Sequence, residues 1–306
     1  MHYNCAYAQH LEEFQEVLLH MIFYFTGSGN SFDVARTIAA TTGDEMVDLG
    51  AAWKTDRFGL RFHVSQGEDL GFVFPVQAWS TPPIVDDFLR EAEFITDNGR
   101  PYVPGYSYCV ITCGNFVGNT AEFFRKMLRT HHGINLDASY SVKSVGNCVY
   151  LYDMPNPARQ EQMVRTERRT AKQVAAAIDA MQMGSFEERN PFGSFMSHFT
   201  GRQNKTRSVA KFHVDTQACI SCGTCQKICP TNTVRLQGGH PTWSGDGCTQ
   251  CLACLHRCPQ QATQYGSHTA KRGRYINPVL KSGRQLTENY PDSPAGTTSD
   301  ISIPFL

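Results

Sequence analysis

The sequence lacks the features that direct a chain out of the cytoplasm or into a membrane. Its N-terminus has no basic segment followed by an apolar core and a small-residue cleavage site, as a signal peptide requires. The longest apolar stretch near that end, Val17 to Phe25, is interrupted by His20 and is too short to span a bilayer. We therefore predict a cytoplasmic protein without membrane insertion.

Recognisable hydrolytic motifs are also missing. The sequence shows no Ser-His-Asp arrangement, no paired carboxylates and no HExxH segment, so hydrolytic chemistry has no support. We assign no catalytic residue from the sequence, and whether the chain is an enzyme or an electron carrier stays open at this point.

Net charge is absent as well, but the balance conceals two oppositely charged halves. Residues 201–306 carry 12 Lys and Arg against 5 Asp and Glu, which makes them +7, whereas residues 1–200 are −7. The basic half lacks interleaved aromatic residues for base stacking, so we predict no nucleic-acid partner. The opposite charges instead favour packing of the two halves against each other.

Strand-like and helix-like segments alternate from residue 21 to about residue 183. Continuous apolar strands between amphipathic helices are typical of a parallel sheet that helices cover on both faces, so we predict a doubly wound α/β domain with five strands. The predicted strands are residues 21–25, 45–49, 70–76, 105–113 and about 139–150, and the predicted helices are 31–41, 82–95, 120–132 and 157–182. Residues 51–69 fit neither period and are expected to form an irregular insertion.

Composition sets the expected boundaries of the other segments. Residues 1–20 are expected to be an N-terminal extension, because the first strand begins directly at Met21. Residues 184–211 are polar, basic and aperiodic, which is typical of a linker. A cysteine-rich domain follows at 212–283, and residues 284–306, rich in Ser, Thr, Pro, Asp and Gly, are expected to be disordered. The α/β domain would then span 21–183.

Eight of the twelve cysteines lie between residues 219 and 258. They form two copies of the pattern C-x2-C-x2-C-x3-C-P with an offset of 29 residues, which indicates an internal duplication. The spacing is that of bacterial ferredoxins with two clusters, in which the fourth cysteine of each copy ligates the other cluster. Structural zinc favours pairs of CxxC, and a disulfide framework is not expected in a chain without an export signal, so iron–sulfur clusters are the favoured interpretation.

The duplicated pattern predicts two interleaved sets of cluster ligands. Two-residue spacers let three thiolates surround one cluster from a tight loop, while the fourth points toward the other cluster. One [4Fe–4S] cluster would use Cys219, Cys222, Cys225 and Cys258, and the second would use Cys248, Cys251, Cys254 and Cys229.

A glycine-rich loop without a cation follows the first strand, with the sequence Thr26-Gly27-Ser28-Gly29-Asn30-Ser31. It lacks the lysine of a nucleoside-triphosphate loop and the third glycine of a dinucleotide fingerprint. Its hydroxyls, together with the amides of 27–31 at a helix N-terminus, can surround a permanently bound phosphomonoester. The loop resembles the phosphate loop of flavodoxins, which holds FMN; the alternative is an ordinary N-cap turn.

Two further loops are predicted to flank the ring of that flavin. Ligands of open α/β sheets bind beyond the carboxyl ends of the strands, at the point where strand order reverses. The loops there are Val76-Gln77-Ala78-Trp79 and Cys113-Gly114-Asn115-Phe116. Trp79 and Phe116 offer aromatic faces for stacking, although either could be a partly buried aromatic side chain without such a role.

The motifs together resemble the flavodoxin–ferredoxin fusion proteins of anaerobes, known as EFR-type ferredoxins. The resemblance is carried by MIFYFTGSGNS, GFVFPVQAW, VITCGN, the doubled cysteine pattern and Arg274-Tyr-Ile-Asn-Pro278. It covers residues 21–280 and implies a flavodoxin-like sheet of order 2-1-3-4-5 that binds FMN, followed by a small α+β ferredoxin-like domain. Gln77 departs from the resemblance, because an aromatic residue is expected there.

The predicted function is the relay of electrons between two [4Fe–4S] clusters and a bound FMN in anaerobic metabolism, with redox proteins as donor and acceptor. The alternative is a flavin-dependent reductase of a small acceptor, fed by its own clusters, in which Cys113 and Asn115 are placed to contribute. A redox sensor is a third hypothesis, but no DNA- or signal-binding module accompanies the cysteine unit.

Overall fold

The computed structural model describes residues 20–97, 99–189, 191–203, 208–245 and 247–281, with the side chains of 198–203 excepted. The expected N-terminal extension lies outside the described residues apart from His20, and the expected tail 284–306 lies outside them entirely. None of the helices in the described ranges is long and apolar enough to cross a membrane.

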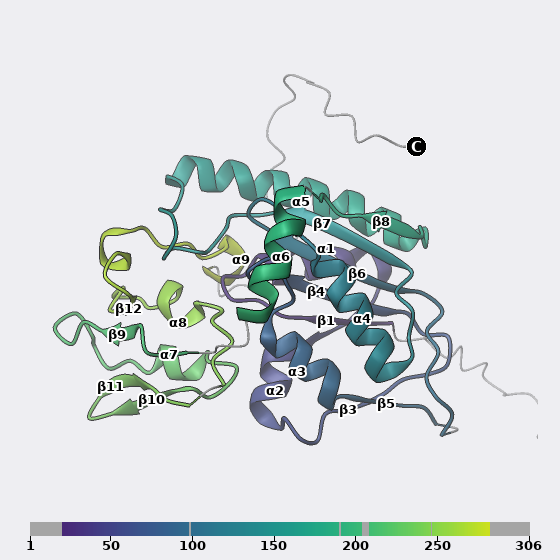
Figure 1. Cartoon of the computed structure of the whole chain (residues 1–306), viewed down its shortest axis with the longest axis horizontal. Helices are drawn as coiled ribbons and strands as arrows, with labels where there is room; N and C mark the ends of the chain where they lie inside the picture. Colours follow the sequence, from purple (N-terminus) through teal and green to yellow (C-terminus); the bar gives the residue numbers. More distant parts are fainter. Residues whose placement is uncertain (1–19, 98, 190, 204–207, 246, 282–306) are drawn as a thin grey trace, which may run out of the picture.

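A parallel six-stranded sheet forms the centre of the larger region (Figure 1). Its strands run in the order β2-β1-β4-β6-β7-β8. Their bounds are β1 (Met21–Tyr24), β2 (Glu45–Asp48), β4 (Leu70–Pro75), β6 (Ser107–Cys113), β7 (Ala138–Lys143) and β8 (Gly184–Phe186). The first five strands have the predicted flavodoxin-like order 2-1-3-4-5, so the predicted fold class is confirmed.

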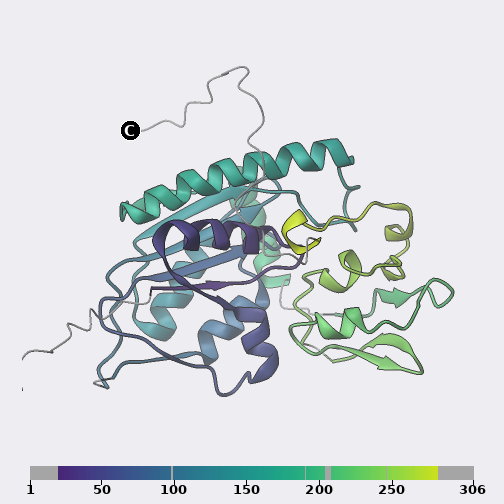
Figure 2. The ribbon, with the colours of Figure 1, turned by 180° about the vertical axis from the view of Figure 1, so that it is seen from behind.

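Helices cover both faces of this sheet, as Figures 1 and 2 show from opposite sides. One face carries α1 (Asn30–Thr42) and α5 (Pro157–Asp179), and the other carries α2 (Leu49–Thr55), α3 (Pro83–Glu91) and α4 (Thr120–His132). Because side chains alternate along a strand, Ile22 packs with the first group of helices and Phe23 with the second. Burial on both faces explains the continuous apolar runs of the sequence.

The sixth strand, β8, departs from the prediction of five strands and of a linker at residues 184–211. β8 has only three residues, too few to show a period, and it is held by parallel pairing with β7 at the sheet edge. A helix follows it in the same interval, α6 (Pro191–Gln203). The Ser197 hydroxyl accepts a hydrogen bond from the amide of Asn119 (2.9 Å), which ties this helix to the larger region.

The expected irregular insertion at 51–69 also contains regular structure. Its first residues complete α2, and β3 (Arg61–His63) pairs in parallel with β5 (Glu93–Ile95). Phe62 of β3 packs edge-on against Phe23 with ring centroids 4.8 Å apart. This contact with the core, rather than local periodicity, accounts for the short strand pair.

The smaller region is built from short elements around the two cysteine segments. Two antiparallel strand pairs, β9 with β12 and β10 with β11, surround two short helices. The bounds are β9 (Phe212–Val214), α7 (Thr224–Lys227), β10 (Val234–Gln237), β11 (His240–Trp243), α8 (Ala253–His256), β12 (Thr263–Tyr265), η1 (Thr269–Lys271) and α9 (Pro278–Lys281). Figure 1 shows this region, green to yellow, beside one end of the sheet.

Candidate functional site

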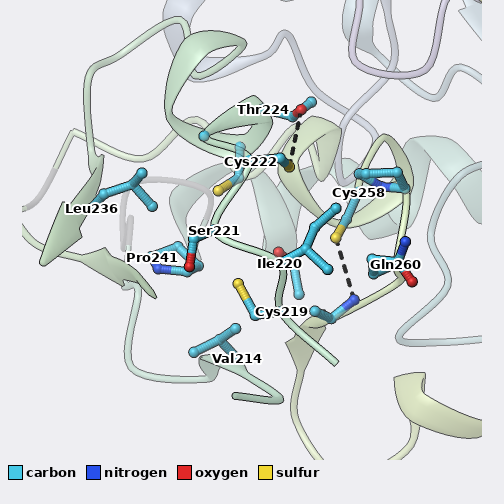
Figure 3. Close-up of a pocket in the computed structure, with 15 residues that line it drawn as sticks. Val214, Cys219, Ile220, Ser221, Cys222, Thr224, Leu236, Pro241, Cys258 and Gln260 are labelled. Atoms are coloured by element: carbon cyan, nitrogen blue, oxygen red, sulfur yellow. Dashed lines mark hydrogen bonds between the residues drawn. The ribbon is translucent and has the colours of Figure 1, made fainter. Parts of the chain in front are cut away.

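Four cysteines from both copies of the repeated pattern line one cavity of the smaller region (Figure 3). They are Cys219, Cys222, Cys225 and Cys258, the set predicted for one cluster. Cys219 and Cys222 belong to the loop that leads into α7, Cys225 lies in α7 itself, and Cys258 follows α8. A hydrogen bond with the Thr224 hydroxyl (3.3 Å) lowers the pKa of the exposed Cys222 thiol. The fold therefore brings the duplicated halves together at this cavity.

The remaining four cysteines of the pattern also lie together, in a more buried place. Burial, together with the neighbouring charges of Cys248 and Cys229, raises the pKa of the Cys251 thiol to about 12. The same two neighbours and Cys251 raise the pKa of Cys254, after burial as the main cause. Cys229 comes from the first copy of the pattern, and the other three come from the second.

Backbone geometry repeats with the same 29-residue offset as the cysteines. Ser221 and Gln250 each have a positive φ, of 56° and 51°, and so do Asn232 and Gln261, at 54° and 51°. Non-glycine residues adopt this conformation only where the surrounding structure imposes it, at a cost of about 1–3 kcal/mol each. The paired positions therefore mark two equivalent loops shaped around their cysteines.

The donor set fits a cluster better than a single ion. Among the described residues, no three His, Cys, Asp or Glu side chains converge closely enough to hold one metal ion. A tetrahedral zinc site requires such convergence, whereas a [4Fe–4S] core holds its four thiolates farther apart. Backbone amides also point at the sulfurs: Ala262 donates to Cys258 Sγ at 3.3 Å and Gln250 to Cys248 Sγ at 3.4 Å.

The glycine-rich loop Thr26–Ser31 joins β1 to α1 and is almost fully buried. The Gly29 amide donates to Thr26 Oγ1 at 3.0 Å, which leaves the hydrogen of that hydroxyl for another acceptor. The Ser31 hydroxyl pairs with Thr112 Oγ1 of β6 at 2.8 Å. The amides of Gly27, Ser28, Asn30 and Ser31 have no acceptor among the described residues. These donors, at the N-terminus of a 13-residue helix, fit a phosphate group that needs no cation.

Gln77, in the loop after β4, was predicted to flank a flavin ring, and in the structure it contacts the smaller region. Gln77 Nε2 donates to the Thr249 carbonyl oxygen at 2.8 Å. Trp79 has a positive φ of 54°, and its ring meets Phe192 of α6 edge-on, with centroids 6.3 Å apart. Val76 and Trp79 are half-buried, and Ala78 is exposed. The resemblance implies an aromatic residue at position 77, and the glutamine found there instead hydrogen-bonds the second cysteine loop.

The loop after β6 combines a buried thiol with exposed polar groups. Burial raises the pKa of Cys113 to about 12, and its Sγ donates to the Asn115 carbonyl oxygen at 3.5 Å. A thiol with this pKa stays protonated at neutral pH and is a poor nucleophile. Gly114 and Asn115 are exposed, and Phe116 is half-buried.

The two regions meet where the glycine-rich loop contacts the second cysteine loop. A Cβ on Gly27 would collide with the carbonyl oxygen of Cys251, so only glycine permits this approach. Asn147, in the loop after β7, donates from Nδ2 to the same oxygen at 3.3 Å. The Asn147 carbonyl oxygen in turn contacts Nε2 of His256 at 2.7 Å. Charged side chains contribute to the contact between the regions as well, since Lys54 of α2 donates from Nζ to the Gln226 carbonyl oxygen at 3.1 Å.

Several residues at this meeting place were not found from the sequence. They are Asn147, Thr249, Tyr275, Asn277 and Glu167. Thr249 lies within the repeated cysteine pattern, and Tyr275 and Asn277 lie in the motif at 274–278, but none of the three had a predicted role. The others lack a motif, because their partners are far away along the chain.

Comparison with known proteins matches the cysteine region. A family model described as a 4Fe-4S dicluster domain matches residues 218–263. A ferredoxin-like protein in the vnf region of Azotobacter chroococcum is 37% identical over 51 residues, which are 15% of this chain and 78% of that protein. Ferredoxin-1 of Rhodobacter capsulatus is 40% identical over 47 residues, 15% of this chain and 71% of that protein.

Among solved structures, an NAD(P)H:quinone oxidoreductase from Methanothermobacter marburgensis aligns with 51% of this chain and 96% of its own, at 14% identity and a TM-score of 0.30. A score this low carries no inference about the larger region, whose fold is described by its own strand order. The matches to ferredoxins show that the smaller region binds 4Fe–4S iron–sulfur and serves electron transfer. Through residues 218–263, the chain therefore belongs to the ferredoxin family with a 4Fe-4S dicluster domain.

Proposed function

We propose that the chain relays electrons between two [4Fe–4S] clusters and one FMN, and that it is a flavodoxin–ferredoxin fusion of the EFR type from anaerobic metabolism. Cys219, Cys222, Cys225 and Cys258 would hold one cluster, and Cys248, Cys251, Cys254 and Cys229 the other. Thr26–Ser31 would hold the flavin phosphate. The flavin would supply a carrier for one or two electrons, complementing clusters that exchange single electrons.

One observation carries the proposal: the second cysteine loop touches the phosphate loop. Cys251 lies against Gly27, and Thr249 receives the side-chain hydrogen bond of Gln77. Both contacts come from loops at the carboxyl ends of β1 and β4, where strand order reverses and where ligands of such sheets bind. The buried cysteine set is therefore the one adjacent to the flavin loops.

The other cysteine set faces outward. Cys222 is exposed and Ile220 beside it has 60% of its surface exposed. This end of the chain would meet redox partner proteins, the donor or the acceptor, while the buried set exchanges electrons internally. The thiolate ligands require a reducing compartment, and we accordingly place the chain in the cytoplasm.

The alternative, reduction of a small acceptor at the flavin, receives little support from the site. Cys113 is buried with a raised pKa, and it lacks the features of a proton donor to an incoming substrate. Steady-state reduction of a small acceptor without any partner protein would favour this alternative.

The test is an anaerobic count of iron, sulfide and flavin in the full chain. We expect about eight iron atoms per chain and one FMN released on denaturation. Ser28→Asp, which places a negative charge in the phosphate loop, should lose the flavin and keep the iron. Ser244→Asp, the same change at an exposed serine, should keep both. Full iron without flavin in the wild type, even after FMN is added, would make Thr26–Ser31 an ordinary turn.

A further inference from the structure

The motif Arg274-Tyr-Ile-Asn-Pro278 begins in the ferredoxin core, where Tyr275 packs with the ligand cysteines, and reaches the phosphate loop at Asn277. We call residues 274–281 the return segment, because here the chain comes back from the cysteine region to the larger one. The backbone amide of Asn277 donates to the Ser28 carbonyl oxygen at 2.8 Å. A Cβ at Gly29 would lie 2.8 Å from Asn277 Cβ and 2.9 Å from Leu280. In Figure 2, the yellow α9 of this segment lies beside one end of α1.

Side chains of the return segment continue this contact in a buried network. The Tyr275 hydroxyl donates to Asn30 Oδ1 at 2.7 Å, and Asn30 Nδ2 donates to the Val145 carbonyl oxygen at 2.8 Å. Asn277 Nδ2 donates to Asn30 Oδ1 at 3.3 Å and to Glu167 Oε1 at 3.1 Å. Tyr275 is 2% exposed, and Asn277 and Glu167 are fully buried. Loss of any member would leave a buried polar group without its partner.

The backbone contact determines which way a peptide group of the loop points. In a trans peptide, the carbonyl oxygen and the following amide hydrogen point in opposite directions. Because the Ser28 carbonyl oxygen faces Asn277, the Gly29 amide faces the interior of the loop, where it holds Thr26 Oγ1. Thr26 is one of the hydroxyls expected to bind phosphate. Gly29 itself has φ 106°, a conformation open to glycine and rarely to other residues.

We propose that Asn277 is a positioning residue for flavin binding, supported by Tyr275 and Glu167. It holds the phosphate loop in its binding shape from the side of the return segment. This inference depends on the proposed function, because it assumes that the loop binds FMN. Its consequence is that the chain beyond the ferredoxin clusters sets the affinity for a cofactor held by the opposite region.

The experiment measures FMN affinity of the full, cluster-containing chain after removal of bound flavin, by the change of flavin fluorescence on titration. Asn277→Ala keeps the backbone amide but removes the side-chain bonds to Asn30 and Glu167 that hold it in place, and it should weaken FMN binding about tenfold or more. Tyr275→Phe should weaken it by a similar or smaller factor. The matched control is Tyr102→Phe, which removes a 2.7 Å bond from a buried tyrosine hydroxyl to the Glu68 carbonyl oxygen, away from the loop. That control should leave FMN affinity unchanged.

A second measurement does not need flavin. Amide hydrogen exchange at residues 27–31 should accelerate in flavin-free Asn277→Ala and stay at the wild-type rate in Tyr102→Phe. Equal FMN affinity of wild type and Asn277→Ala, or an equal loss in the control, would overturn the role of Asn277. Failure of the wild type to bind FMN would instead overturn the proposed function, and the exchange data would still decide whether the return segment shapes the loop.

Discussion

The flavodoxin-like region and the ferredoxin region differ in what fills their interiors. The first buries large aromatic side chains on one face of its sheet, among them Phe23, Phe72, Phe88 and Phe124. The second shares its core with residues 145–164 of the larger region, and the cysteines Cys225, Cys229 and Cys254 are themselves part of that core. A region whose core is made partly of ligands depends on the bound cluster for its stability, whereas an apolar sheet core does not.

The two regions also differ in the groups that they offer to a cofactor. The flavodoxin-like region presents backbone amides at a helix N-terminus, and the ferredoxin region presents thiolates at fixed spacing. Nearly every residue has a backbone N–H, so a site built from these donors is hard to recognise in the sequence. The spacing of cysteine ligands is much easier to recognise. The same difference makes one site sensitive to backbone shape and the other to loss of a single side chain.

The largest expected effect is a loss of iron and of folded structure in the ferredoxin region alone. Cys254→Ala should remove a cluster ligand, so that the cysteine region loses most of its iron absorption and its hydrogen-exchange protection while the sheet keeps its protection. Cys109→Ala is the matched control, because Cys109 is a fully buried cysteine of β6 outside the repeated pattern. It should keep the clusters and lose stability through a small cavity. Equal loss of iron in both variants would contradict the assignment.

The next effect concerns the contact between the regions. Gly27→Ala places a Cβ against the Cys251 carbonyl oxygen, and we expect a loss of about 1–3 kcal/mol in the free energy of unfolding by denaturant. Gly247→Ala is the control, because a Cβ there meets only Thr233 Oγ1, at 3.8 Å. A Gly27→Ala chain as stable as the control would mean that the two loops do not touch.

A third expected effect is a pH dependence of stability through Glu167 of α5, which accepts a hydrogen bond from Asn277 of the return segment. Burial raises the pKa of Glu167 from 4.5 to about 8; the Asp33 charge raises it too, while hydrogen bonds from Ser144 and Asn277 and the Arg168 charge lower it. The folded state therefore binds the proton more tightly than the unfolded state, and stability should fall as pH rises from about 4.5 to about 8.

Glu167→Gln removes this titration while keeping an oxygen acceptor for Asn277. Unfolding free energies measured from pH 5 to 9 should fall more steeply for the wild type than for Glu167→Gln, by about 1.4 kcal/mol for each unit by which folding raises the pKa. Parallel curves for the two chains would show that Glu167 has an ordinary pKa.

Much of the fold could be predicted, because the spacing of apolar residues along the chain indicates which segments form strands and which form helices. Apolar runs between amphipathic helices indicated the parallel sheet, and the strand order was as expected. The count of strands was wrong, since β8 is too short for a pattern and forms only beside β7. The pair of β3 and β5 was not predicted either. Its strands have only three residues each, and Phe62 of β3 is positioned by its contact with Phe23 in the core.

The site was predicted unevenly. The two interleaved cysteine sets were expected from spacing, and the fold groups the cysteines in this way. The departure at Gln77 was noticed, but its partner Thr249 is 172 residues away and could not be inferred. The role of the return segment was likewise hidden, since Asn277 and Asn30 are separated by 247 residues.

By itself the sequence determined what depends on near neighbours: the alternation of strands and helices, the glycine-rich turn and the ligand spacing of eight cysteines. Those features follow from backbone geometry over a few residues, so they can be predicted without the fold. Only the tertiary structure decided that the second cysteine loop meets the glycine-rich loop Thr26–Ser31 and that the backbone amide of Asn277 hydrogen-bonds Ser28 of that loop. Those contacts join residues without common spacing, and they exist only because the folded core brings distant loops to one edge of the sheet.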